Sequence, residues 1–367
     1  MSQKLKLGII YGGRSGEHEV SLMSARSVLS VIDTAKYDVI EIGISRQGKW
    51  FVGDDLWFKL KDEDLLNLTP AYFLPIPQNP GIYTVRNGEM SLLSPLDIVF
   101  PVMHGSFSED GALQGLFELA DIAYVGAGVL GSAVCLDKGL FKNVMLANHI
   151  PILPFHVFNR MELEKDITAC LQTAEAIADY PLYTKPANLG SSVGISKCKD
   201  RTDLLKGLME ASRYDRRILV EKGLQNPREI EVSVLGNENP SASVPGEVIP
   251  KDIFYTYAEK YINDTAELVT KTDLSPEMVA TIQGLAVKAY TATDCAGMAR
   301  VDFLIDRETM QAYLSEINTI PGFTKISMFP KLWEASGLSY PALIETLIEL
   351  ALERKVQRDR TEREFRR

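Results

Sequence analysis

The stretch KLGIIYGGRSGEHEVSLMSARSVLSV, residues 6–31, establishes the class of fold. Residues 6–11 are mostly apolar and predict a buried strand, which Gly12 and Gly13 end. A helix is expected from about Glu17, because small and apolar side chains then recur at helical spacing. A strand, a glycine turn and a helix in this order are typical of a parallel α/β sheet. The expected inner face of the helix comprises Val20, Met23, Ser24, Ser27, Val28 and Val31.

The same alternation continues along the chain. Strands are expected at 37–45 and 96–103, and a helix from Glu109 whose inner face includes Leu113 and Phe117. These elements predict a parallel α/β sheet over residues 1–130. Residues 60–95 are rich in Asp, Asn and Pro and are expected to form a surface insertion.

The remainder of the chain divides into two further parts. Residues 131–225 are expected to hold helices around 129–148 and 161–178, with strands at 181–185, 194–197 and 218–222. From residue 226 the character changes, because residues 229–234 alternate between acidic and apolar side chains, as in a strand with two unlike faces. Ser275 predicts a helix N-cap. We therefore predict three domains, 1–130, 131–225 and 226–367.

Composition excludes several classes of protein. The chain has 367 residues, a mass of 40.8 kDa, 46% hydrophobic and 24% charged residues, as expected of a globular protein with more than one core. Its net charge of −10 argues against nucleic-acid binding. No apolar run is long enough to cross a membrane. The four cysteines form no C-x-x-C pair and the four histidines no zinc spacing, so we expect reduced thiols and a cytoplasmic protein.

Two short segments carry the most specific polar pattern. Residues two apart in a strand share a face, so Arg300 projects with Asp302, and Glu316 projects with Asn318. If the two strands are neighbours, three oxygen donors and a guanidinium meet on one face. Such donors suit Mg²⁺, which prefers a few carboxylates completed by phosphates and water. The alternative is a structural pair between an arginine and an acid at a sheet edge.

A glycine-serine loop at 190–194 follows Lys185 and predicts an anion site, although such a loop is more often only a turn. Four lysines, three of them in or beside apolar segments, strengthen the phosphate interpretation, whereas a single lysine there usually only extends its charged end to solvent. They are Lys138, Lys185, Lys222 and Lys260. Glu17 and His104 follow strand ends, where ligands of α/β sheets gather. Helix-dipole complementarity and a turn histidine are equally good interpretations of these two residues.

In their order and spacing these segments resemble the D-alanine–D-alanine ligase family of the ATP-grasp superfamily. The resemblance runs from about residue 7 to 352. It rests on GGRSGEHEVS at 12–21, HG at 104–105 with EDG at 109–111, LDK at 136–138, KPA at 185–187 with GSSVG at 190–194, VEKG at 220–223, REIE at 228–231, RVD at 300–302 and EINTIPGFT at 316–324. It implies a three-domain ATP-grasp architecture, in which an N-terminal parallel α/β domain is joined to two α+β domains that grip ATP.

The resemblance implies that ATP phosphorylates the carboxylate of one D-alanine and that the amine of a second attacks the acyl phosphate. The product would be D-alanyl-D-alanine for peptidoglycan precursor synthesis. Glu17 would hold the first ammonium, with Ser191 and Tyr261 in the same hydrogen-bonded network. Arg300 and the Gly322 N–H would stabilise the oxyanion. The second D-alanine's carboxylate would lie at Ser327 and Met328, with His104 nearby.

The family's ATP and metal sites are likewise implied residue by residue. Lys138 and Lys185 would contact phosphates, Lys260 the γ-phosphate, and Glu229 the ribose. Two Mg²⁺, or Mn²⁺, would be held by Asp302, Glu316 and Asn318. The remaining ATP-site residues implied are Ser192 in the glycine-serine loop and Glu221, Lys222 and Leu224 at the adenine and hinge. The family is commonly dimeric, so a homodimer is expected.

The chain departs from the family in its expected closing loop, at about 251–266. An acid is usual where Thr256 stands, E-A-K-Y where Ala258 to Tyr261 stand, and a proline near Lys271. These differences leave the core chemistry intact and bear on loop dynamics. Two alternatives remain: an ATP-binding module without catalysis, and a D-alanine–D-lactate ligase. Tyr261 favours the amine acceptor, because those ester-forming enzymes carry a histidine there.

Overall fold

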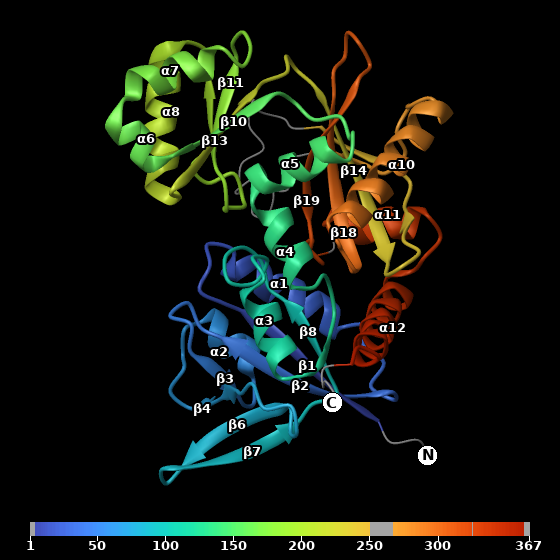
Figure 1. Cartoon of the computed structure of the whole chain (residues 1–367). Helices are drawn as coiled ribbons and strands as arrows, with labels where there is room; N and C mark the ends of the chain where they lie inside the picture. The colour runs from blue at the N-terminus through green and yellow to red at the C-terminus, as the bar shows by residue number, and fades with distance from the viewer. Residues whose placement is uncertain (1–3, 250–266, 325, 363–367) are drawn as a thin grey trace.

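The computed structural model describes residues 4–249, 267–324 and 326–362. Figure 1 shows three sheet-bearing parts around a central group of helices, with the N-terminal part in blue, the central part in green and yellow, and the C-terminal part in orange and red. Among the described residues, no helix has the length and apolar character needed to span a membrane. The order of helices and strands gives the mixed α/β architecture expected from the alternating elements in the sequence.

The N-terminal sheet has the strand order β4-β3-β2-β1-β8-β9. Its inner strands are parallel, and Leu7 pairs with Val39 on one side and with Ile98 on the other. The sheet contains β1 (Leu5–Gly12), β2 (Tyr37–Ile44), β3 (Trp50–Val52), β4 (Thr69–Pro70), β8 (Ile98–Val102) and β9 (Ala123–Tyr124). β3 and β4 run antiparallel, unlike the expected all-parallel sheet. The connection between β2 and β3 is short, and short connections join antiparallel strands.

Three helices accompany this sheet: α1 (His18–Leu29), α2 (Leu56–Lys61) and α3 (Ala112–Leu119). The predicted helix after residue 17 is confirmed, but its buried face differs in part from the expected one. Val20, Ser24 and Val28 are buried, whereas Met23 is exposed. Leu22 and Ala25 are buried instead, because α1 packs on both β1 and α2.

Residues 60–95 are more than a surface insertion. They include an antiparallel sheet of β5 (Tyr72–Phe73), β6 (Gly81–Arg86) and β7 (Glu89–Pro95). Phe73 and Ile82 are buried in a core that includes Phe117 of α3. The expectation is wrong for these side chains, because a polar average composition conceals the few apolar residues on one face of a strand.

The central sheet is antiparallel, in the order β10-β13-β11-β12. Its core joins Val220 to Leu204 and Leu208 of the helix at Arg201–Tyr214. The strands are β10 (Phe155–Asn159), β11 (Leu182–Pro186), β12 (Ser196–Cys198) and β13 (Arg217–Lys222), and the helices are α6 (Arg160–Lys165), α7 (Ile167–Glu175) and α8 (Arg201–Tyr214).

The C-terminal sheet has the order β17-β16-β14-β18-β19, with β15 paired to β14. It comprises β14 (Arg228–Gly236), β15 (Ser241–Ala242), β16 (Gly246–Ile249), β17 (Glu267–Val269), β18 (Gly297–Ile305) and β19 (Ala312–Asn318). Helix α10 (Pro276–Ala292) begins as predicted, since Ser275 Oγ accepts the Met278 N–H at 3.2 Å. Helices α11 (Met328–Ala335) and α12 (Tyr340–Asp359) follow.

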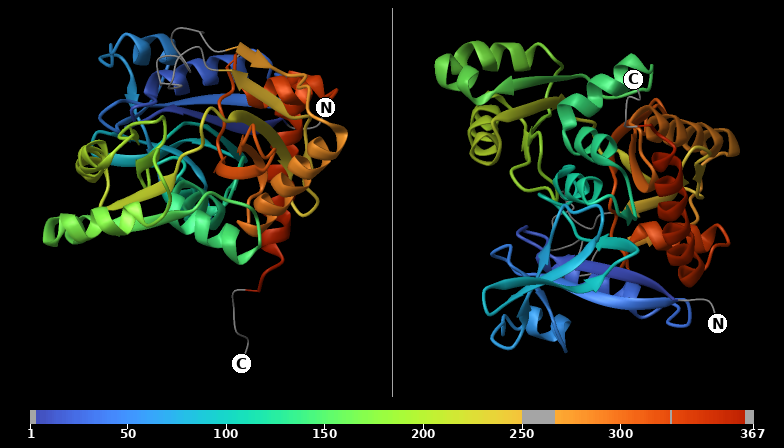
Figure 2. Two further views of the ribbon diagram at one scale, coloured as in Figure 1. Left: turned by 90° about the horizontal axis from the view of Figure 1, so that it is seen from above. Right: turned by 60° about the horizontal axis from the view of Figure 1, so that its bottom comes forward.

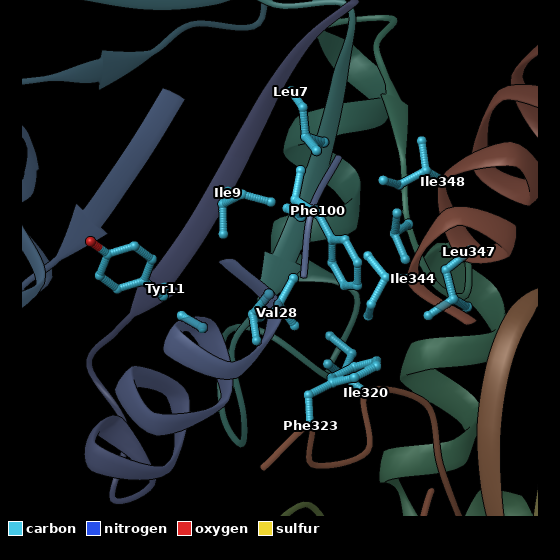
Figure 3. Packing of buried hydrophobic residues seen from close by; sticks show 14 of the residues in the cluster. Leu7, Ile9, Tyr11, Val28, Phe100, Ile320, Phe323, Ile344, Leu347 and Ile348 are labelled. Atoms are coloured by element: carbon cyan, nitrogen blue, oxygen red, sulfur yellow. The ribbon is translucent and has the colours of Figure 1, made fainter. Parts of the chain in front are cut away.

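Elements distant in sequence join these parts. Helices α4 (Val129–Leu136) and α5 (Lys138–Ala147) run between the N-terminal, central and C-terminal parts, as Figure 1 and the further views of Figure 2 show. Phe141 of α5 packs in the core of the C-terminal sheet. Figure 3 shows Ile344 and Leu347 of α12 beside Leu7 and Phe100 of the N-terminal sheet. The cleft described below lies where these parts meet.

Candidate active site

The predicted polar segments lie on neighbouring strands, as the sequence pattern required. β18 pairs with β19, which places Arg300 opposite Asn318 and Asp302 opposite Glu316. β14 lies on the other side of β18 and sets Glu231 opposite Asp302. Three carboxylates therefore form one row across three strands. Glu231 had no role in the sequence-based prediction, although the acidic face of its strand was recognised.

Arg300 is held by the acids of this row. Its Nε and Nη2 donate to the two carboxylate oxygens of Asp302 at 2.8 and 2.7 Å. Its Nε also lies 3.1 Å from Glu231 Oε2. This bidentate pair restricts the guanidinium to one geometry. The structure thus contains the arginine–acid pair that was the alternative to a metal site.

The cation-binding capacity of the row depends on its remaining oxygens. Within residues 4–249, 267–324 and 326–362, no hydrogen bond reaches the buried Oδ1 of Asn318. In the same ranges, Asp, Glu, His and Cys side chains form no group of three placed to hold a metal ion. A buried oxygen without a partner costs free energy that a ligand can recover. Asn318 and Glu316 thus fit Mg²⁺ in donor type, while Asp302 is engaged by Arg300.

Glu17 lies at the start of α1, on the opposite side of the cleft. Ser15 Oγ accepts the Glu17 N–H at 3.0 Å and donates to the His104 carbonyl at 2.8 Å. Gly105 has φ +77°, and a Cβ there would lie 2.6 Å from Glu17 Oε2. Only glycine permits this close approach. The carboxylate of Glu17 accepts a hydrogen bond from the Ser191 hydroxyl.

Ser191 belongs to the glycine-serine loop between β11 and β12. Ser191 and Ser192 have φ of 54° and 59°, in the left-handed region that residues other than glycine seldom occupy. This conformation brings a loop of the central part to the N-terminal part. The hydrogen bond between Ser191 and Glu17 therefore links two of the three parts across the cleft.

Glu109 is a second acid beside Glu17 for which sequence reasoning proposed no role. Burial raises the pKa of Glu109, and the neighbouring Glu17 carboxylate raises it further. The Gly105 N–H donates to Glu109 Oε2 at 2.6 Å, which acts in the opposite direction. Its position in the EDG motif, shortly after His104, was the available sequence signal.

Lysine side chains approach the cleft from α5 and β11. Lys138 Nζ donates to the Leu189 carbonyl at 2.7 Å. Burial lowers the pKa of Lys138, against the raising influence of Glu316. Lys185 forms an ion pair with Glu221, which raises the pKa of this lysine although burial alone would lower it. Both lysines are thus cations near a row of acids, and Lys138 is buried while Lys185 is partly buried.

A third lysine, Lys142, completes a buried cluster with Glu221. Lys142 Nζ lies 2.8 Å from Glu221 Oε2, while Lys185 occupies the other oxygen. Burial alone would raise the pKa of Glu221, but the two ammonium groups outweigh it and lower the pKa to about 2. Lys142 was not among the site residues predicted from the sequence. It follows Lys138 by one helical turn, so the helical spacing could have revealed it.

Many of these groups line one cleft of about 940 Å³, part of it open to solvent, whereas Asp302, Lys142, Lys185 and Glu221 are not among its lining residues. Of the predicted site residues, the structure brings together along its wall Glu17, Lys138, Ser191, Arg300, Glu316, Asn318, Gly322, Ser327 and Met328. The cleft has acids on its N-terminal and C-terminal sides and a lysine between them. It is therefore suited to a small ligand with ammonium groups together with an anion.

Comparison with known proteins agrees with this geometry. Residues 6–127 match the family described as D-ala D-ala ligase N-terminus, and residues 144–349 match D-ala D-ala ligase C-terminus. The chain belongs to the D-alanine–D-alanine ligase family. A D-alanine–D-alanine ligase of Natranaerobius thermophilus is 42% identical over 99% of each chain, and one of Thermoanaerobacter sp. is 46% identical over 96% of this chain and 97% of its own.

Solved structures of the family share the fold. The D-alanine–D-alanine ligase from Coxiella burnetii matches with a TM-score of 0.82 and 37% identity, over 98% of this chain and 97% of its own. The VanG D-Ala:D-Ser ligase from Enterococcus faecalis matches with a TM-score of 0.85 and 34% identity, over 95% of this chain and all of its own. The predicted ATP-grasp fold is thereby confirmed.

The other residues predicted from the family resemblance are not among those that line the cleft, or lie outside the described residues. Leu224 is buried in the connection from β13 to β14; Lys222 is the last residue of β13, and Glu229 is the second residue of β14. His104 is buried, and protein atoms contact both of its ring nitrogens. The predictions for Lys260 and Tyr261, and the departures at Thr256 and Ala258, lie outside the described residues.

Proposed function

We propose that this chain joins two D-alanine molecules with the consumption of ATP, through a D-alanyl phosphate. One observation carries the proposal: Glu17 from the N-terminal part and Arg300, Glu316 and Gly322 from the C-terminal part line the same cleft. An acid for an ammonium group and a guanidinium for a developing oxyanion are what an acyl transfer to an amine requires. The family to which the chain belongs carries out this ligation.

The chain's own residues divide the work by charge. Glu17, oriented by Ser15 and Ser191, holds the ammonium of the first D-alanine. Lys138 and Lys185 supply positive charge for the phosphates of ATP, so that the substrate carboxylate can approach the γ-phosphate. Arg300, held by Asp302, stabilises the oxyanion together with the Gly322 N–H.

We assign two divalent cations, Mg²⁺ or Mn²⁺, to Glu316, Asn318 and Asp302. The support is the donor type of these residues and the unpartnered buried oxygen of Asn318 within the described chain. When bound, the cations neutralise phosphate charge. Asp302 would have to share its carboxylate between a cation and Arg300.

The test is phosphate release from ATP and Mg²⁺, with and without D-alanine. D-alanine should stimulate release and L-alanine should not. A module that binds ATP without catalysis would bind nucleotide but release no D-alanine-dependent phosphate. Absence of stimulation at saturating D-alanine would overturn the ligase assignment.

The acceptor is tested separately by competition. Equal D-alanine, D-lactate and D-serine are supplied at pH 6 and pH 8, and the products are separated by mass. We expect D-alanyl-D-alanine to predominate at both pH values. D-serine is included because VanG, a D-Ala:D-Ser ligase, shares the fold. Predominant ester would instead favour the D-lactate alternative.

Three further features rest on the family resemblance. We propose that the chain forms a homodimer, acts in the cytoplasm to supply D-alanyl-D-alanine for peptidoglycan precursor synthesis, and is divided near residues 130 and 225. The described cysteines are all free thiols, which suits a reducing compartment. Sedimentation equilibrium checks the first feature, since a mass near 40.8 kDa would contradict a dimer.

A further inference from the structure

A buried hydrogen-bonded chain connects α1 to the segment that carries Gly322. The Phe323 N–H donates to Ser24 Oγ at 3.3 Å. Ser24 Oγ lies 3.1 Å from His104 Nε2, and His104 Nδ1 lies 3.0 Å from the Ile320 carbonyl. All four residues are buried. This hydrogen-bonded chain thus starts and ends on residues 320–323 and passes through two residues of the N-terminal part.

The proton positions follow from the partners. A carbonyl oxygen only accepts, so His104 Nδ1 carries the hydrogen that Ile320 receives. In the neutral ring Nε2 then has a lone pair, which accepts the Ser24 hydroxyl hydrogen. Ser24 Oγ keeps its own lone pairs for the Phe323 N–H. Every donor in this chain therefore meets one acceptor, and protonation of Nε2 would leave the Ser24 hydroxyl hydrogen without its partner.

The surroundings of His104 favour the neutral ring. Burial lowers the pKa of His104, while the Glu17 carboxylate and the Ile320 carbonyl raise it and Arg300 lowers it. The net direction is downward. His104 is thus neutral near pH 7, as the hydrogen-bonded chain requires.

The segment is restrained on its other side as well. The Phe323 carbonyl accepts from Tyr340 Oη at 3.0 Å, and its ring packs against Phe100 with 5.7 Å between ring centroids. Figure 3 shows Ile320 and Phe323 packed near Val28 of α1. A Cβ on Gly322 would lie 2.6 Å from Ser327 Oγ. These contacts fix the position of the segment, and with it the position of the Gly322 N–H relative to the cleft.

We propose that Ser24 and His104 are positioning residues that hold the 320–323 segment so that the Gly322 N–H meets the reacting group. They act through the backbone and need no contact with substrate. The proposal rests on the proposed function, which assigns the oxyanion to Gly322. It gives His104 a different task from the substrate contact that the family resemblance implies.

The test compares Ser24→Ala with Ser21→Ala. Ser21 is an equally buried serine on the same helix, and its Oγ accepts the Gly12 N–H at 2.7 Å and donates to the Val102 carbonyl at 2.5 Å. It has no hydrogen bond to the 320–323 segment. We expect Ser24→Ala to lower kcat by about tenfold with KM for ATP within about twofold, and Ser21→Ala to keep kcat within about threefold.

Amide hydrogen exchange provides a readout independent of turnover. In Ser24→Ala the Phe323 amide should exchange at least about tenfold faster than in the parent protein, and in Ser21→Ala its rate should not change. Nitrogen chemical shifts of the His104 ring should show the hydrogen on Nδ1. Unchanged Phe323 exchange in Ser24→Ala, or an equal fall in kcat in both variants, would overturn the proposal.

His104→Gln separates positioning from direct binding. A higher KM for D-alanine with unchanged Phe323 exchange would show substrate contact and contradict the proposal. Faster exchange with a lower kcat supports it. If the parent protein shows no D-alanine-dependent phosphate release, the proposed function fails, while the exchange and ring measurements still test the hydrogen-bonded chain.

Discussion

Glu316 faces Asp302 from the neighbouring strand and lines the cleft, so its contribution to turnover can be separated from its contribution to folding. We expect Glu316→Ala to lower kcat by about 10² or more, the size of effect seen when one preorganised charge-stabilising group is removed. Measurement of D-alanine-dependent phosphate release checks this. Near-full activity would show that the cation assignment is wrong.

Glu308→Ala is the matched control for that substitution. Glu308 is exposed in the turn that joins β18 to β19. Its replacement by alanine therefore removes a carboxylate of the same kind from the same hairpin, away from the cleft. Its kcat should stay within about twofold of the parent, since surface substitutions of this kind change little. Circular dichroism should show both variants folded.

The pKa of Glu221 makes a testable contribution to stability. Lys142 and Lys185 hold this pKa at about 2, below its usual value, so the folded state favours the ionised form. A lowered folded-state pKa gives stability that is complete above the unfolded pKa, about 4.3, and is lost as pH falls toward 2. Glu221→Gln has no such titration. The difference in unfolding free energy between parent and variant should therefore be constant from pH 8 to 5 and shrink below about 4.3.

Urea denaturation at several pH values measures that difference. At neutral pH the variant should be less stable by about 3 kcal/mol, because Lys142 and Lys185 lose the charge that compensates their burial. A difference that stayed constant down to pH 3 would contradict the assigned direction. Glu334→Gln, which alters an exposed acid on α11, serves as the comparison.

Among the elements, the C-terminal helix α12 packs on the N-terminal sheet. Leu347 is fully buried in the core that also contains Leu7 and Phe100 of the N-terminal sheet. Leu347→Ala should lower the free energy of unfolding by about 2–5 kcal/mol, through lost burial and a residual cavity. The substitution should destabilise the N-terminal part as well, because that part supplies the other wall of the core.

Tryptophan fluorescence during urea unfolding detects this effect. Trp50 and Trp57 lie in the N-terminal part and Trp333 in α11, so Trp333→Phe leaves only N-terminal reporters. In that background Leu347→Ala should still shift the midpoint to lower urea. Val356→Ala, on the exposed side of the same helix, should shift it little. An unmoved N-terminal transition would mean that α12 is energetically independent of this core.

For the whole molecule, the cleft predicts that ligand binding and global stability are linked. All three parts contribute to its wall, so a ligand seated there contacts groups that separate on unfolding. A non-hydrolysable ATP analogue with Mg²⁺ at 100 times its Kd should stabilise the folded state by about 2.7 kcal/mol. Thermal unfolding measures this, and EDTA should remove most of the gain. Equal stabilisation with and without Mg²⁺ would contradict a cation at Glu316 and Asn318.

Local features of the chain were predictable because they depend on near neighbours. Strand β1, the turn at Gly12 and helix α1 followed from hydrophobic spacing, and Ser275 followed from the chemistry of helix capping. The pairing of Arg300 with Asp302 on one face follows from strand periodicity alone. The order of the short motifs was sufficient to indicate the family, although each is weak by itself.

Contacts between distant segments required the folded chain. Glu221 of β13 forms an ion pair with Lys142 of α5, far away in the sequence, and His104 meets Ile320 across 216 residues of sequence. Burial also changes the chemistry, since it raises the pKa of Glu109 and lowers that of His104 without a signal in either residue's neighbours in sequence. Spacing and propensity act over a few residues, whereas desolvation and charge pairing depend on everything that packs around a group. The individual segments and the family were therefore accessible from sequence, and the charge states and linkages of the cleft came from the tertiary structure.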